Sequence, residues 1–277
     1  MKTLLKSLKS LDFSKTLFTP LDEQEEKWIE IFLQQSSENK VTLLSPGGKL
    51  QIPVEELKLL VQDGWITDIV IDGYLSLLIG ESDSFFIAGN TTASEIRDVL
   101  FRPHIFAFSP FFYTRLCGSG EEFDFAGVRQ WTVASKIDVL QRDLLLFPIL
   151  HSKVHWFLTC LDLRTRKVLF LDPYPGRLPV KEVCSNLLRW LINEVSEKYG
   201  ETKARDLEPS GWRIVNCFDI PSQRDTNNCG VYLLLFAHHL EQGRVINFTQ
   251  EDVSNARKRI LFSILSSKLY TLPDDFS

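Results

Sequence analysis

The feature that most constrains this chain is a polar loop that leads directly into a strongly apolar segment. The loop spans residues 221–228, the apolar run spans residues 231–237, and Cys229 lies at the junction between them. Asn227 and Asn228 are residue types that commonly cap the N-terminus of a helix. Because the apolar residues cover more than one helical face, we expect a helix that begins at this junction and runs through the core.

Cys229 is the chemically reactive residue at the start of this expected helix. Unpaired backbone N–H groups and the positive end of the helix dipole converge there, and both favour a thiolate over a thiol. Gly230 follows directly and leaves the backbone beside the thiol uncovered, while Gln223 lies six positions earlier in the loop. A lone cysteine is more often a buried structural residue, but the polar loop and the helix start favour a nucleophile here.

A cysteine nucleophile needs a base, and the chain has five histidines. His155 begins a strand-like run, residues 155–163, which is followed by a polar turn and a second run, residues 168–172, that stops at Pro173. The two runs predict a β-hairpin whose open end carries His155 on one strand and Asp172 on the other. His104 and His151 lie in loop-like surroundings and lack such a partner. His238 and His239 lie too far along the Cys229 helix, and we expect them at the helix end or on the surface.

The register of this hairpin is not settled by the sequence. Closing it over residues 164–167 sets Asp172 opposite Thr159 rather than His155. Thr159 and His155 share a face of the strand, because side chains alternate along it, so the parity is right. An offset of four residues remains. Twist, a bulge or a displaced strand must close it, and the choice stays open.

These residues resemble a known family, the ubiquitin-like-protein proteases, also called SUMO or sentrin proteases, which are Ulp-type cysteine peptidases. The order His, Asp, Gln, Cys with these neighbours is specific, and the resemblance covers residues 52–272, most of the chain. The chain departs from the family at Asn228, where Asp is usual, and at residues 173–175, where Pro-Tyr-Pro replaces the usual serine. The motifs that carry the resemblance are Gly64-Trp65-Ile66-Thr67-Asp68, Arg129-Gln130-Trp131-Thr132, Asp143 to Ile149, His155-Trp156, Asp172, Gln223 and Cys229-Gly230.

The resemblance implies catalytic roles that also agree with the chemistry of the residues. His155 takes the proton of Cys229 or holds a thiolate–imidazolium pair, and Asp172 fixes the tautomer and orientation of the imidazole. The Gln223 amide and the backbone N–H of Cys229 stabilise the oxyanion of the tetrahedral intermediate, an effect often worth about 3–4 kcal/mol. The alternatives that stay open are a turn-capping role for Asp172, a loop-bracing role for Gln223, and a different acid as partner, Asp162 or Asp225.

Three further residues are expected to bind the substrate. Trp65 and Trp156 resemble the pair of tryptophans that encloses the C-terminal tail of the modifier in this family. Two indole faces leave a slot that passes Gly-Gly, which has no Cβ atoms, and excludes Ala-Ala. Asp68 would then offer a carboxylate to an arginine of the modifier. The alternative is that both tryptophans are core residues.

We therefore expect a cysteine isopeptidase that removes a ubiquitin-like modifier, SUMO in the first place, from lysine side chains and processes its precursor. The alternatives are a ubiquitin or Nedd-type deconjugase acting as a bacterial effector in a host cell, an effector-type acyltransferase, and a catalytically silent binding module. The choice of modifier depends on a broad binding surface that the sequence does not reveal. The resemblance implies an intracellular monomer in nucleus or cytoplasm, or a secreted effector, whose partners are the modifier and its conjugates.

Composition narrows the class of protein. A net charge of −5 and a pI near 5.6 argue against a nucleic-acid binder, which is usually basic. The five cysteines are widely spread and include no C-x-x-C, so we expect a reducing compartment and no disulfide framework, metal or cofactor. The chain has no run of about 18 apolar residues, so we expect no membrane span.

The pattern of elements predicts an α+β fold with a central mixed sheet packed against helices, and the resemblance implies one related to papain. We divide the chain into a helical N-terminal extension, residues 1–45, and a Ulp-like cysteine protease domain, residues 46–277. A final helix within 247–269 carries Arg257, Lys258 and Arg259, which we expect on a solvated face. Helices are also expected over 21–36, 52–60, 67–79 and 180–199, strands over 144–150 and 212–218, and strands or buried turns over 84–88 and 106–110.

Overall fold

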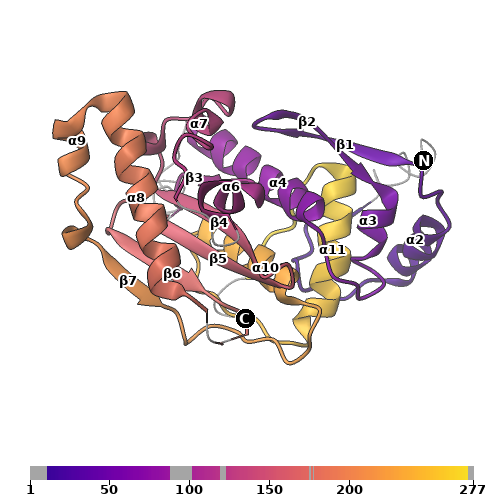
Figure 1. The fold of residues 1–277 in the computed structure, drawn as a ribbon. Coiled ribbons are helices and arrows are strands. Elements are labelled where there is room, and N and C mark those ends of the chain that lie inside the picture. The colour runs from indigo at the N-terminus through magenta and orange to yellow at the C-terminus, as the bar shows by residue number, and fades with distance from the viewer. Residues whose placement is uncertain (1–10, 88–101, 119–122, 175, 177, 274–277) are drawn as a thin grey trace, which may run out of the picture.

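The computed structural model describes residues 11–273 except 88–101, 119–122, 175 and 177 (Figure 1). Its central sheet consists of β3 (Ile105–Ala107), β4 (Leu144–His151), β5 (His155–Asp162), β6 (Lys167–Leu171) and β7 (Arg213–Asn216), in that order. The β4–β5 and β5–β6 pairs are antiparallel, whereas the outer pairs β3–β4 and β6–β7 are parallel. The expected mixed sheet is therefore confirmed.

Helices cover both faces of this sheet. α10 (Cys229–Glu241) packs against β5 on one face, and α4 (Asp68–Ile87) and α11 (Asp252–Ser266) pack against α10. On the other face α6 (Phe111–Cys117) contacts β4, and α8 (Val180–Tyr199) contacts β6 and β7. In Figure 1 α8 lies in front of the sheet and α10 behind it. This arrangement confirms the α+β class.

The interior position of α10 follows from its sequence. Its apolar residues point in all directions around the axis, and every residue from Cys229 to His239 is buried. The prediction of a helix-end position for His238 and His239 is confirmed, because both lie in the last turn of α10. They are buried rather than at the surface, because α4 packs against α10. The Tyr74 hydroxyl lies 2.9 Å from Nδ1 of His238. Burial lowers the pKa of His238 to about 3, so this histidine is neutral.

The N-terminal part of the chain adds a smaller layer beside α11. It consists of α2 (Glu23–Leu33), the antiparallel hairpin β1 (Lys40–Ser45)–β2 (Gly48–Pro53) and α3 (Val54–Lys58). The predicted boundary at residue 45 falls inside this hairpin, and the division of the chain stays a prediction. Residues 1–10 of the predicted N-terminal extension lie outside the described residues.

Most other predicted elements are confirmed with small differences at their ends. The exception is segment 84–87, which we expected as a strand or buried turn and which is the last turn of α4; residue 88 lies outside the described chain. Among the described residues, no helix is long and apolar enough to cross a membrane. The remaining short elements are α7 (Trp131–Ala134), α9 (Glu201–Arg205) and the 3₁₀ turns η2 (Val139–Gln141) and η3 (Pro209–Gly211).

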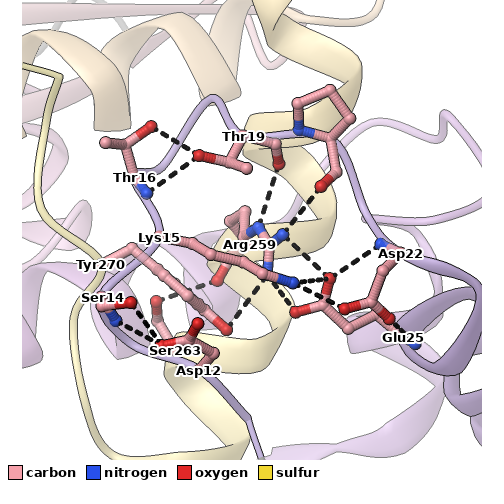
Figure 2. Close-up of polar contacts among 11 residues, drawn as sticks. Asp12, Ser14, Lys15, Thr16, Thr19, Asp22, Glu25, Arg259, Ser263 and Tyr270 are labelled. Carbon is pink, nitrogen blue, oxygen red and sulfur yellow. Dashed lines mark hydrogen bonds and ion pairs between the residues drawn. The ribbon is translucent and has the colours of Figure 1, made fainter.

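The prediction of a solvated arginine face on α11 is wrong for Arg257 and Arg259, which are 1% and 0% exposed. Arg259 donates two hydrogen bonds to the Glu25 carboxylate, at 2.6 and 3.0 Å, as Figure 2 shows. Its other hydrogen bonds go to the carbonyl oxygens of Thr19 and Pro20 and to the Tyr270 hydroxyl. Because all five guanidinium N–H groups donate, the buried charge is satisfied, and the segment before α2 is fixed to α11.

Candidate active site

The candidate active site lies where the start of α10 meets the open end of the β5–β6 hairpin. Cys229 is the first residue of α10 and His155 is the first residue of β5, while Asp172 directly follows the last residue of β6. Gln223 lies in the loop between β7 and α10. The structure thus brings together His155, Asp172 and Cys229, and it joins the backbone of Gln223 to Pro173, the residue after Asp172.

The register of the hairpin, which the sequence left open, differs by two residues from a closure over residues 164–167. Asp162 pairs with Lys167, so the turn spans residues 163–166 and Leu158 pairs with Leu171. One further step places Asp172 opposite Phe157, two positions from His155 rather than four. Because β6 ends at Leu171, the Asp172 side chain is free to reach along the edge. Its Oδ1 lies 2.7 Å from Nε2 of His155.

The turn itself explains the shift in register. Oδ1 of Asp162 accepts hydrogen bonds from the backbone N–H groups of Arg164 and Thr165, at 3.0 and 3.1 Å, and Oδ2 accepts one from the Thr165 hydroxyl. Asp162 therefore closes the hairpin at the last residue of β5, whereas His155 is the first residue of that strand. This position removes Asp162 as the acid partner of the histidine.

The pKa of His155 is set by its burial and by its hydrogen bonds to Asp172 and Cys229. Burial alone would lower the pKa of His155, but hydrogen bonds with Asp172 and with the Cys229 thiol outweigh it and raise the pKa to about 9. Since Nε2 faces Asp172, Nδ1 remains for the thiol. Asp172 is 6% exposed, and its Oδ1 also accepts a hydrogen bond from the backbone N–H of Tyr174 at 3.0 Å. The carboxylate thus caps the turn and contacts the imidazole at once.

Gln223 is buried beside this pair. Its backbone N–H donates to the carbonyl oxygen of Pro173 at 2.7 Å, which fixes the loop to the residue after Asp172. Its side-chain Oε1 is buried and has no hydrogen-bond partner among the residues that the structure describes. The backbone of Gln223 therefore braces the loop, and Oε1 of its side chain takes no part in this bracing.

The predicted tryptophan pair has two different environments. Trp156 is 5% exposed, and its indole N–H donates to the carbonyl oxygen of Ile66 at 3.3 Å. Trp65 is 49% exposed, so its indole is not a core residue. A Cβ atom on Gly230 would lie 2.6 Å from Ile66 Cγ1 and 3.2 Å from Trp156 Cδ1. Three parts of the chain therefore meet in close contact here: the segment of Trp65 and Ile66, strand β5, and the start of α10.

Asp68, the third predicted substrate-binding residue, is the first residue of α4 and is partly exposed. Its negative charge, after burial as the larger cause, helps to raise the pKa of Asp72 one turn later to about 6. Its role toward a substrate stays a prediction. Within the described part of the chain, no group of three or more His, Cys, Asp or Glu residues could hold a metal ion.

The sequence reasoning missed Arg257 as a residue of the site. Its guanidinium donates to Oδ1 of Asn228 at 2.5 Å, and Asn228 directly precedes Cys229. A signal for it was present in α11. The i, i+4, i+7 spacing of a buried helix face is present at Val253, Arg257 and Ile260. This spacing predicts that Arg257 is buried and therefore needs a hydrogen-bond partner inside the protein.

Comparison with known proteins places this geometry in a family. Residues 65–269 match the Ulp1 protease family, C-terminal catalytic domain. The chain is 27% identical over 252 residues to ubiquitin-like-specific protease 1A of Arabidopsis thaliana, covering 91% of this chain and 46% of that protein. It is 30% identical over 221 residues to a sentrin-specific protease of Caenorhabditis elegans, covering 79% of this chain and 28% of that protein. The chain thus spans less than half the length of either relative.

A solved structure supports the fold. The C-terminal Ulp1 protease domain in complex with Smt3, the yeast ortholog of SUMO, superposes with a TM-score of 0.66 at 22% identity. The superposition covers 91% of this chain and 98% of that domain. The resemblance in fold that the sequence implied is therefore confirmed.

Proposed function

Because the chain belongs to the Ulp1 protease family, with its catalytic domain over residues 65–269, we propose that it is a cysteine isopeptidase that removes a SUMO-type modifier from lysine side chains. The observation that carries this proposal is the line of contacts from Asp172 through His155 to the thiol at the start of α10. A raised pKa of His155 and a helix N-terminus both favour the thiolate–imidazolium pair.

The reaction follows from these two groups. The Cys229 thiolate forms a C–S bond with the carbonyl carbon of the terminal glycine of the modifier. The C–N bond to the lysine amine then breaks, and the His155 imidazolium donates its proton to that amine. In the second half, His155 takes a proton from water, which attacks the thioester. The C–S bond then breaks, the modifier leaves with a free carboxylate, and the Cys229 thiolate remains beside the His155 imidazolium, as at the start.

Gln223 is assigned to the oxyanion. The negative oxygen of the tetrahedral intermediate forms next to Cys229, where the backbone N–H of Cys229 and the side-chain amide of Gln223 can donate to it. Support for this role comes from the bracing of the loop by the Gln223 backbone, which leaves the buried amide for another purpose. Asp172 holds the imidazole in one tautomer through its contact with Nε2.

The modifier tail is assigned to the segment that carries Trp65. The half-exposed Trp65 lies one residue before Ile66, whose carbonyl accepts from Trp156, and Trp156 directly follows His155. An extended Gly-Gly tail passing these indoles would reach the thiol, and Asp68 would offer a carboxylate to a basic residue of the modifier. The same pair is expected to reject alanine at either tail position.

SUMO is the modifier we propose, because the superposed Ulp1 domain was solved with Smt3 and the relatives are named for sentrin or ubiquitin-like substrates. These relatives do not favour the ubiquitin or Nedd-type effector or the acyltransferase. All five cysteines are free thiols, which fits the reducing interior of a cell, nucleus or cytoplasm. A monomer with no nucleic-acid partner remains our expectation.

The test is a panel of modifiers, SUMO, ubiquitin and a Nedd-type protein, each carrying a C-terminal electrophile in place of the last carboxylate. We expect the SUMO probe to form one covalent adduct at Cys229, seen as an increase in the mass of the protein by the mass of one probe. A Cys229→Ala variant should stay unlabelled. Labelling by ubiquitin alone would assign a different modifier. Labelling of another cysteine, or of none by any modifier, would contradict the proposed function.

A further inference from the structure

Arg257 lies between the loop of residues 59–64, which directly precedes Trp65, and the start of α10. It is 1% exposed and lies on the inner face of α11. Its Nε donates to the carbonyl oxygen of Leu60 at 2.8 Å, and its Nη2 donates to those of Leu59 and Gly64, both at 2.5 Å. Its Nη1 donates to Oδ1 of Asn228 at 2.5 Å.

These contacts join two segments that the proposed reaction must keep together. Gly64 directly precedes Trp65, and Asn228 directly precedes Cys229. A second contact reinforces the first, because the Asn227 side-chain amide donates to the carbonyl oxygen of Asp63. The guanidinium therefore fixes the loop of residues 59–64 against the first turn of α10.

The buried charge of Arg257 is balanced through an amide. The Asn228 side chain accepts from Arg257 with its oxygen and donates with its nitrogen to Oδ2 of Asp225 at 2.8 Å. Oδ1 of Asp225 accepts from the backbone N–H groups of Asn227 and Asn228, at 3.1 and 3.0 Å. Gln250 donates to Oδ2 at 2.7 Å. Burial would raise the pKa of Asp225, but these hydrogen bonds lower it, so the carboxylate is charged.

The amide at position 228 is required by this geometry. A carboxylate there would contact Arg257 directly, but its second oxygen would face Oδ2 of Asp225 at the 2.8 Å now bridged by an N–H group. Two carboxylates at that distance repel each other strongly in a buried site. Asn228 is also where the chain departs from the Asp that is usual in the family, so the negative charge has its place at Asp225 instead.

We propose that Asp225, Asn228 and Arg257 form a bridged ion pair that positions Cys229 relative to His155 and to the segment carrying Trp65. All three are positioning residues, since none of them touches the reacting atoms. Asp225, weighed from the sequence as a rival partner of His155, has this role instead. The inference rests on the proposed function for its link to turnover, but the position of the thiol can be measured without any modifier.

The experiment exchanges the two groups. Asn228→Asp, Asp225→Asn and the double variant D225N/N228D are compared with the unaltered chain. Each is measured for kcat and KM on SUMO with a C-terminal fluorophore, for the pH profile of Cys229 alkylation by iodoacetamide, and for thermal unfolding. Asn228→Asp adds a charge to the site and Asp225→Asn removes one, whereas the double variant restores one carboxylate and one amide.

We expect each single variant to lower kcat by about 10-fold or more with KM changed less than about 3-fold, and to shift the alkylation profile. The double variant should return kcat to within about 3-fold of the original and restore the profile, because contacting residues are not additive. If a single variant does not fold, recovery of folding and alkylation in the double variant carries the same result. Losses that multiply in the double variant would overturn the proposal, as would single variants with unchanged kcat and alkylation.

Two matched controls separate positioning from stability. Asp63→Asn removes the other carboxylate near Arg257, at 3.5 Å but 75% exposed, and should leave kcat within about 2-fold. Arg259 is as buried as Arg257, and Arg259→Lys removes its bidentate contact with Glu25 (Figure 2). This variant should lower the melting temperature with an unchanged alkylation profile. An Arg259→Lys effect on alkylation as large as that of Asn228→Asp would overturn a specific role. Alkylation coupled as expected without cleavage of SUMO would contradict the proposed function alone.

Discussion

The close approach of Gly230 to Ile66 and Trp156 gives a sharp prediction for Gly230→Ala. The added Cβ would lie 2.6 Å from Ile66 Cγ1 and 3.0 Å from its Cδ1, which is 0.8 and 0.4 Å short of the 3.4 Å at which carbon contacts become ordinary. Ile66 is 3% exposed and Trp156 is 5% exposed, so neither side chain can yield toward solvent. The start of α10 and the Ile66 segment must therefore separate.

The magnitude follows from two opposing effects. Overpacking a closed site costs about 1–3 kcal/mol. Replacing a helical glycine by alanine stabilises by about 1 kcal/mol. The net loss in the free energy of unfolding is therefore about 0–2 kcal/mol, which leaves a folded protein. Activity should fall much more, because a displacement of the thiol by about 1 Å costs on the order of 10²-fold.

The assay is kcat/KM on a fluorogenic SUMO substrate beside thermal unfolding, with Gly80→Ala as the matched control. Gly80 lies inside α4, and a Cβ there would meet nothing within 4 Å. We expect Gly80→Ala to stabilise by about 1 kcal/mol at unchanged kcat/KM, and Gly230→Ala to lose about 10²-fold in kcat/KM. A Gly230→Ala variant that matches the control in both measurements would refute the reasoning.

Three further predictions concern the reaction centre. Cys229→Ala should abolish cleavage and leave modifier binding measurable; turnover in a clean preparation would mean that another residue is the nucleophile. Gln223→Ala should lower kcat by about 10²–10³-fold with little change in KM, whereas a rise in KM alone would restore the loop-bracing role. The imidazolium of His155 exists below its pKa, so kcat/KM should fall as the pH rises through about 9. Asp172→Asn should move this limit to lower pH, and an unmoved limit would contradict the ion pair.

The parts of the fold that could be predicted are those fixed by local patterns. The helix over residues 180–199 matches α8 from Val180 to Tyr199, because Pro179 and Gly200 interrupt the 3.6-residue period at both ends. The start of α10 could be predicted for a similar reason, since polar residues change to apolar ones within two positions. The position of the turn was less predictable, because the Asp162 carboxylate accepts two backbone N–H groups and the turn lies at residues 163–166 instead of 164–167.

Residues whose environment is set by distant segments could not be predicted. His238 lies at the helix end, as the sequence suggests, but its ring is buried against Tyr74, 164 positions away. Arg259 looks like part of a basic surface, yet it binds Glu25, 234 positions away. In each case the local sequence describes the residue, whereas burial depends on which element packs over it. Such positions are where propensity is overridden by tertiary contact.

The two buried arginines of α11 share a physical cause. Irregular segments carry carbonyl groups that no helix or sheet ladder satisfies, and burying such groups without a partner costs about 1–3 kcal/mol each. Arg257 supplies donors to the carbonyls of Leu59, Leu60 and Gly64, and Arg259 to those of Thr19 and Pro20. A guanidinium has five donors in a fixed plane, so one side chain can satisfy a whole turn of chain where lysine could not. α11 therefore holds the segment before α2 with Arg259 and the loop of residues 59–64 with Arg257, and a change at either position acts on a different part of the molecule.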